Sequence, residues 1–129
     1  MHLEKILPRA LAGTGATIDF SGDWVNELKS VMHLTQQNGS LSGTYESAVS
    51  GGGGTTVGDL LGYVDGSLIS FVVHWRDFQA ITAWVGQIDP QAATPTINTL
   101  WQMTKAVEPG SEWASINAGA DYFTRKAAK

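Results

Sequence analysis

Residues 31–47 read VMHLTQQNGSLSGTYES, and this stretch decides the fold class. At its centre stands Asn38-Gly39, the strongest short signal for a β-hairpin, because both residues accept the positive φ that the turn requires. On either side, at residues 31–36 and 41–47, apolar and polar side chains alternate, which is typical of strands with one buried face. A β-hairpin is therefore predicted here.

The same alternation continues along the chain, with turn signals such as Asp65-Gly66 and Glu108-Pro109-Gly110 at short intervals. The predicted strands are residues 21–28, 31–36, 41–47, 57–64, 67–75, 79–88, 96–106 and 113–124. Eight short strands with mainly local connections can close into an antiparallel up-and-down β-barrel, although a β-sandwich remains an alternative. We expect an all-β domain at residues 19–125, a flexible N-terminal tail or leader remnant at 1–18, and a C-terminal tail at 126–129.

Composition and charge argue against several classes of partner and binding site. The chain has 129 residues, enough for one domain, and a net charge of −4 with no basic run, which argues against nucleic acid and acidic membranes as partners. It has no cysteine and no apolar stretch of membrane-spanning length. Pro8 and Arg9 interrupt the N-terminal apolar residues, so no clear signal peptide is present. His2, His33 and His74 lack metal-ligand spacing.

Four of the five tryptophans fall in four successive predicted strands, each near a polar stretch: Trp75, Trp84, Trp101 and Trp113. Any one of them could be an ordinary core residue. Because a core that needs only volume can use Leu, Ile or Phe, four tryptophans in sequence favour a pocket near the strand ends.

Strand alternation also places polar groups on shared faces. The pairs and triplets expected to share a face are Tyr45 with Ser47, Asn26 with Leu28 and Ser30, Thr82 with Trp84, Trp101 with Met103, and Asp121 with Phe123. An aromatic and apolar lining with a few polar groups is typical of a small-molecule site.

Several separated motifs resemble the avidin and streptavidin family over about residues 20–125. They are residues 42–49 (SGTYESAV), Trp75, residues 82–87 (TAWVGQ), residues 97–101 (INTLW), Trp113, Asp121 and Phe123-Thr124. The resemblance implies an eight-stranded barrel that binds biotin without catalysis, with no cofactor and no metal.

The resemblance also implies a role for each matching position. Asn26, Ser30 and Tyr45 would donate hydrogen bonds to the ureido oxygen of biotin, and Asp121 and Ser47 would accept from its N–H groups. Thr82 would contact the ring sulfur. The residues that would enclose the ring and the valeryl chain are Trp75, Trp84, Trp101, Leu28, Val49 and Met103. Trp24 matches a structural tryptophan at the closed end of family barrels.

Two departures from the family pattern stand out. The first is Ala80, which replaces a serine that helps to hold the biotin carboxylate. The backbone N–H of Gly51, in a glycine-rich loop, would offset this loss.

The second departure concerns the assembly. Trp113 matches a residue that closes a neighbouring subunit's pocket, which implies a homo-oligomer, with a tetramer favoured over a dimer. Ala118 and Ala120 replace bulkier interface residues and weaken that expectation. The resemblance further implies a secreted or periplasmic protein.

Two other functions compete with biotin binding. A glycosidase-like enzyme could pair Glu46 with Asp121, but alternation points Glu46 away from Tyr45 and Ser47. A lipocalin-like carrier would need a more uniformly apolar interior than the polar side chains of Asn26, Ser30 and Asp121 allow.

Overall fold

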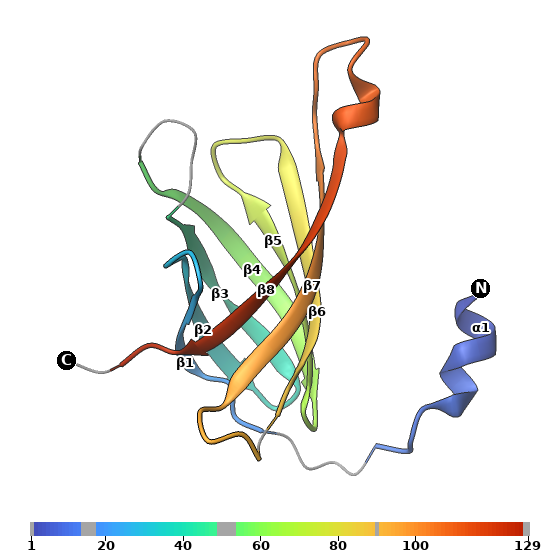
Figure 1. The fold of residues 1–129 in the computed structure, drawn as a ribbon, viewed down its shortest axis with the longest axis vertical. Coiled ribbons are helices and arrows are strands. Elements are labelled where there is room, and N and C mark those ends of the chain that lie inside the picture. The colour runs from blue at the N-terminus through green and yellow to red at the C-terminus, as the bar shows by residue number, and fades with distance from the viewer. Residues whose placement is uncertain (1, 14–17, 49–53, 90, 128–129) are drawn as a thin grey trace.

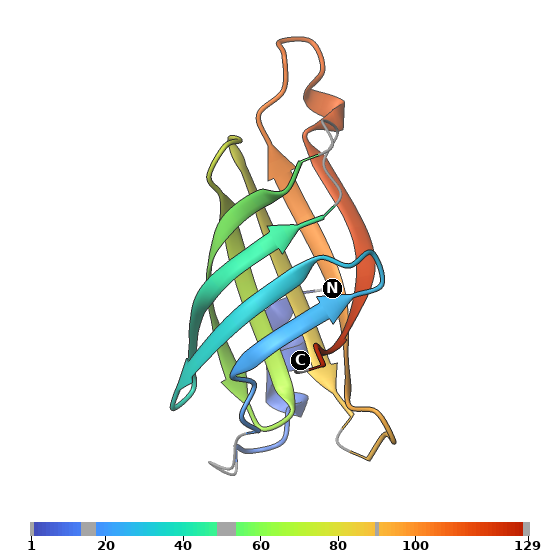
Figure 2. The same cartoon turned by 90° about the vertical axis from the view of Figure 1, so that its left-hand side faces the viewer.

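The computed structural model describes residues 2–13, 18–48, 54–89 and 91–127. It is a closed barrel in which each strand is antiparallel to the next and the last pairs with the first (Figures 1 and 2). The strands are β1 (Gly22–Asn26), β2 (Val31–Gln37), β3 (Ser40–Ser47), β4 (Thr56–Asp65), β5 (Leu68–Trp75), β6 (Ala80–Ile88), β7 (Thr96–Lys105) and β8 (Ile116–Arg125). The barrel prediction is confirmed, and the sandwich alternative is wrong.

The turn between β2 and β3 forms where the sequence indicated it. Asn38 has a φ of 56°, the left-handed conformation that asparagine tolerates better than most side chains. The hairpin then continues in register, with Gln37 opposite Ser40 and Val31 opposite Glu46.

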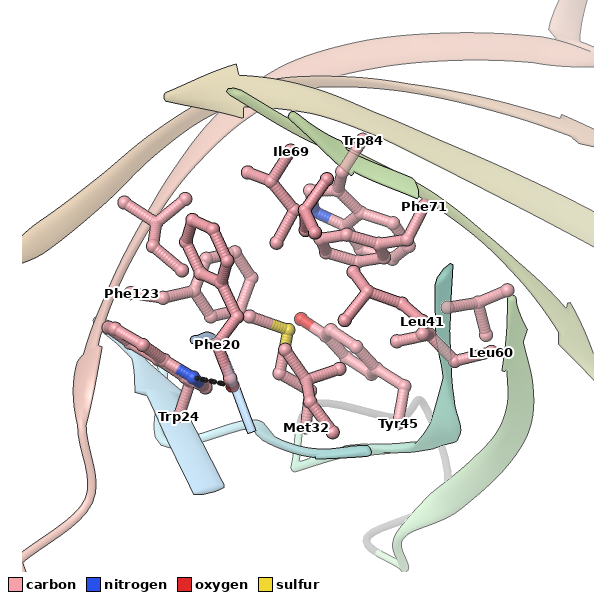
Figure 3. Close-up of a cluster of buried hydrophobic side chains, with 14 of the residues drawn as sticks. Phe20, Trp24, Met32, Leu41, Tyr45, Leu60, Ile69, Phe71, Trp84 and Phe123 are labelled. Atoms are coloured by element: carbon pink, nitrogen blue, oxygen red, sulfur yellow. Dashed lines mark hydrogen bonds between the residues drawn. The ribbon is translucent and has the colours of Figure 1, made fainter. Parts of the chain in front are cut away.

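Side chains alternate between the barrel interior and the outer face, as the pleat requires. In β5, Ile69, Phe71 and Val73 are buried while Ser70, Val72 and His74 are exposed. The interior side chains form one apolar cluster, part of which Figure 3 shows.

One part of this cluster fills one end of the barrel, and we call it the closed end. Phe20, Trp24, Met32, Ile97 and Phe123 lie there with no exposed surface. The Trp24 Nε1–H donates to the Phe20 carbonyl oxygen at 2.9 Å (Figure 3), and the Arg125 guanidinium lies 4.4 Å from the centre of the Trp24 ring. At the opposite end, which we call the open end, β1, β3, β5 and β7 end and β2, β4, β6 and β8 begin (Figure 1).

Leu28 lies differently from the prediction. Strand β1 ends at Asn26, and Leu28 lies in the following turn with 56% of its surface exposed. The turn forms because Lys29 adopts a φ of 68° and the Leu28 and Ser30 N–H groups donate to the Asn26 side-chain oxygen. Leu28 therefore does not share a strand face with Asn26.

The tryptophans also differ from the prediction. Trp75 is the last residue of β5, as expected for a tryptophan at a strand end. Trp84 and Trp101 instead lie in the interior of β6 and β7. Trp113 belongs to a 3₁₀ helix at Glu112–Ala114, before β8 begins at Ile116. The hydrogen bonds from Ala114 N–H to the Ser111 carbonyl and from Ser115 N–H to the Glu112 carbonyl form these tight turns.

The N-terminal segment contains two short helices that the sequence pattern did not predict, α1 (Leu3–Ile6) and a 3₁₀ helix at Leu7–Arg9. None of their residues is buried. In the described part of the chain, no helix has both the length and the hydropathy needed to cross a bilayer.

Candidate functional site

A polar cluster lies inside the barrel next to the β1–β2 turn. Asn26, Ser30 and Tyr45 are each at most 8% exposed. The Asn26 amide closes the turn with its oxygen and donates from Nδ2 to the Tyr45 hydroxyl oxygen at 3.2 Å. The turn that ends β1 thus also fixes the amide toward β3.

Ser30 joins this cluster from the residue immediately before β2. Its hydroxyl oxygen accepts a hydrogen bond from the Ala48 N–H at 3.0 Å, and its hydroxyl also lies within hydrogen-bonding reach of Tyr45. Burial raises the pKa of the Tyr45 phenol, and the nearby negative charge of Asp121 raises it further, so Tyr45 stays a protonated donor at neutral pH. Three donor groups, an amide and two hydroxyls, therefore converge on one region.

Asp121 faces the same space from β8. Its Oδ2 accepts a hydrogen bond from Trp84 Nε1–H at 2.9 Å, and its side chain is half-buried. Burial raises the pKa of the Asp121 carboxyl, the Trp84 N–H partly offsets this, and the neighbouring Glu27 carboxyl raises it again. The site thus has one acidic acceptor opposite its donors.

Aromatic rings form a stack along one side of this space (Figure 3). Tyr45 stacks on Trp84 with ring centres 4.8 Å apart, and Trp84 stacks on Phe71 at 5.0 Å. Trp75 meets Tyr45 edge-on at 5.6 Å and donates from Nε1 to the Thr82 hydroxyl oxygen at 3.0 Å. Each indole N–H of Trp75 and Trp84 is thus held by a polar group of the site.

Trp101 and Met103 continue the lining from β7, both partly buried. Trp101 lies opposite Trp84 on one side and Gly119 on the other. A Cβ at position 119 would lie 2.5 Å from Trp101 Cζ2, far inside van der Waals contact. Gly119 therefore leaves the room that the Trp101 ring occupies.

The remaining predicted positions fall into three groups. Ser47 and Ala80 lie at the open ends of β3 and β6, and Ala80 has no polar side-chain atom to bind a carboxylate. Leu28 and Trp113 are exposed, Trp113 at 86%. Val49 and Gly51 lie outside the described residues.

Three residues of this region were missed by the sequence reasoning. Glu27 lies beside Asp121, Gly119 lies under Trp101, and the Thr99 hydroxyl donates to the Asp121 backbone oxygen at 2.9 Å. Strand alternation alone could have found Thr99, since it shares a face with Trp101. The other two depend on contacts across strands that the local pattern does not contain.

The enzyme alternative has no support in the geometry. Glu46 is exposed on the outer face of β3, where its Oε1 lies 3.4 Å from His33 Nε2, while Asp121 faces the interior. The two carboxyl groups therefore lie on opposite faces of the barrel wall.

Among the residues that the structure describes, no group of three His, Cys, Asp or Glu side chains could hold a metal ion.

Comparisons with known proteins agree with this geometry. The family model described as "Avidin family" matches residues 14–126. Among solved structures, Xenavidin is similar with a TM-score of 0.72 and 28% identity over 86% of this chain and 100% of that chain. The structure titled AVR2 is similar with a TM-score of 0.73 and 29% identity over 85% of this chain and 97% of its own.

Proposed function

The chain belongs to the avidin family of non-catalytic biotin-binding proteins, and from this premise we propose that it sequesters biotin with high affinity at the open end of its barrel. The observation that carries the proposal is the convergence of three donors, Asn26, Ser30 and Tyr45, opposite the Asp121 carboxyl. A ureido group offers the complementary pattern, one strong acceptor oxygen flanked by two N–H donors.

The polar groups of the site can exchange partners when biotin enters. Asn26 donates to Tyr45 at 3.2 Å, a long contact that a ureido oxygen can replace. Three donors that converge on one oxygen polarise it toward an oxyanion and strengthen each bond. Asp121 and Ser47 then accept from the ureido N–H groups.

The aromatic residues supply the apolar part of the site. Trp75, Trp84 and Trp101 enclose the bicyclic ring, with Thr82 next to the ring sulfur. Met103, Leu28 and Val49 flank the valeryl chain. Burial of an apolar ligand among such rings contributes about 25 cal/mol for each Å² removed from water.

The biotin carboxylate is held less firmly than the ureido group in this proposal. Ala80 provides no hydroxyl, so the carboxylate depends on backbone N–H groups, of which Gly51 is our candidate. A missing hydrogen bond to a charged group corresponds to about 1.5–3 kcal/mol.

We further propose that sites are completed between subunits. Trp113 is 86% exposed on the β7–β8 connection, so its ring is free to contact a neighbouring chain. On the outer face, Tyr63, Ser70, Val85 and Leu100 lie opposite one another in register across β4 to β7, and Tyr63, Val85 and Leu100 are 76%, 63% and 71% exposed. A second copy of the chain is the occupant that we propose for this row, in a tetramer that brings Trp113 to a neighbour's pocket.

Light scattering after size exclusion tests the assembly. We expect a tetramer for the native chain and a smaller species for Val85→Glu, with Thr35→Glu, an exposed position on β2, as the control. A monomeric native chain would contradict the proposal that Trp113 closes a neighbouring site.

We propose that the protein acts outside the cytoplasm, because avidin-family proteins are typically secreted.

A titration tests the binding function itself. Biotin should quench the tryptophan fluorescence of the native protein in a saturable manner and raise its unfolding temperature, because a ligand that binds only the folded state stabilises it by mass action. Lipoic acid, which has a similar acid chain but no ureido group, is the matched control ligand. Equal responses to both ligands would favour the general hydrophobic carrier instead, and no response to either would reject both functions.

A further inference from the structure

We propose that the Lys105 ammonium binds the carboxylate of the ligand, at the position where Ala80 leaves that group without a side-chain donor. The inference rests on the proposed function and deepens it, because it adds a charged contact to the backbone N–H groups considered above. Lys105 lies outside the set of residues to which the family resemblance assigns a role.

Lys105 is the last residue of β7 and lies on the face of that strand that lines the barrel interior. Buried or partly buried residues alternate with exposed ones along β7, and Thr99, Trp101, Met103 and Lys105 are of the first kind. Because side chains two residues apart point to the same side of a sheet, Lys105 continues the row of Trp101 and Met103 toward the open end. It lies about 7 Å beyond Met103 along the strand.

The register of β6 on β7 places Ala80 directly opposite Lys105. Residues that face one another across an antiparallel pair lie on the same side of the sheet and close together. Ala80 is 9% exposed and shares its face with Thr82 and Trp84. Lys105 is therefore the cross-strand neighbour of the position that lacks a hydroxyl, on the same inward face.

The backbone at the end of β7 is held from both sides. The Lys105 N–H donates to the Ser115 carbonyl oxygen at 2.8 Å, and the Ala106 N–H donates to the Gln79 carbonyl oxygen at 2.9 Å. The lysine side chain therefore starts from a fixed point. Only its own rotamers have to be ordered when an anion binds.

The charge of Lys105 is not used elsewhere in the described part of the chain. Over residues 2–13, 18–48, 54–89 and 91–127, no ion pair joins its ammonium to a carboxylate. By contrast, the Arg76 guanidinium bonds to Asp59 Oδ1 at 2.8 Å. A partly buried lysine can cover apolar surface with its stem and keep its ammonium in water. The ammonium is thus available at the open end.

An acid chain that passes Met103 brings its carboxylate to this ammonium. In the proposed function the ureido group binds Asp121, which lies opposite Thr99 on β7, and the valeryl chain runs past Met103. The next inward position of the strand is Lys105. The attraction between the two charges should weaken as salt is added, because the pair lies where solvent reaches it.

Biotin and biotinamide, in which an uncharged amide replaces the carboxylate, are the two probes. Their dissociation constants are measured for the native protein, Lys105→Met and Lys105→Arg. Methionine keeps an unbranched apolar stem without the charge, and arginine keeps the charge. Lys126→Met removes the same charge from an exposed position after the end of β8, so it is the matched control.

We expect Lys105→Met to weaken the binding of biotin by about three- to tenfold, between the effects of an exposed ion pair and of a hydrogen bond to a charged group. The binding of biotinamide should change by less than about twofold. Lys105→Arg and Lys126→Met should keep the native ratio of the two dissociation constants. In the native protein, added salt should reduce the preference for biotin over biotinamide.

An equal change for both ligands in Lys105→Met would overturn the inference, since the residue would then act through its stem alone. No change for either ligand would also overturn it, as would the same loss of preference in Lys126→Met. If Lys105→Met does not fold, the native protein decides, because a preference for biotin that salt leaves unchanged contradicts a contact between charges. A native protein that binds neither ligand would instead refute the proposed function, and this inference with it.

Discussion

The tryptophans at the two ends of the barrel donate their indole N–H groups to different kinds of acceptor. At the closed end, Trp24 is fully buried, donates to a backbone oxygen and has the Arg125 guanidinium over its ring. At the open end, Trp75 and Trp84 donate to the side chains of Thr82 and Asp121. Both ends satisfy the indole N–H, but only the open end does so with side chains that can also bind a ligand.

This difference places the contacts for stability and those for ligand binding at opposite ends of one continuous core. A backbone acceptor such as the Phe20 carbonyl is fixed by its segment, whereas the hydroxyl of Thr82 and the carboxyl of Asp121 have lone pairs to spare. The closed end should therefore determine how firmly the barrel holds together, and the open end should determine what it binds.

The largest expected effect is at the closed end. Trp24→Ala should lower the free energy of unfolding by about 3–5 kcal/mol, because it leaves a cavity where the ring is fully buried. Denaturant unfolding measures it. Phe78→Ala, which removes an exposed aromatic ring between β5 and β6, is the control for loss of an aromatic ring as such. An equal loss from both variants would break the distinction between the two ends.

Asp121→Ala should have the next largest effect, on affinity. It should weaken biotin binding by about 1.5–3 kcal/mol, roughly ten- to 150-fold, because a charged acceptor is lost. The unfolding free energy should change by less than about 1 kcal/mol, since the removed carboxyl is itself costly to bury. Calorimetric titration and denaturant unfolding give the two numbers, and Asp121→Asn separates the charge from the shape. Unchanged affinity would show that the ureido contacts are wrongly assigned.

Gly119→Ala should have a smaller effect and lower the free energy of unfolding by about 1–3 kcal/mol, because the new methyl group collides with Trp101. Displacement of this wall should also speed biotin release. Ala118→Gly, at the neighbouring exposed position in β8, controls for a change of one methyl group in this strand. Normal stability and release in Gly119→Ala would mean that the ring can move without consequence.

The sequence predicts the barrel well because its strands carry local information. The Asn38-Gly39 turn and the alternation around Tyr45 are readable from neighbouring residues, and eight strands with short connections are enough to close a barrel, as they do here. The inward positions of Tyr45, Trp84 and Asp121 follow from the same two-residue period.

The parts that could not be predicted depend on distant contacts. Leu28 leaves the strand pattern because the Asn26 side chain closes a turn there. Glu27 reaches Tyr122 across 95 positions of sequence, and Gly119 matters only because the register places Trp101 beside it. Closure between β1 and β8 sets the first of these contacts, the register of β7 on β8 sets the second, and no local pattern encodes either.

The most direct test of the difference between the two ends is the indole N–H spectrum of ¹⁵N-labelled protein with and without biotin. Each tryptophan gives one resonance, which Trp→Phe variants can assign. Biotin should shift the resonances of Trp75, Trp84 and Trp101, and leave that of Trp24, bonded to the Phe20 carbonyl at the closed end, unchanged. A shift at Trp24 without shifts at Trp75 and Trp84 would contradict the placement of the biotin site at the open end.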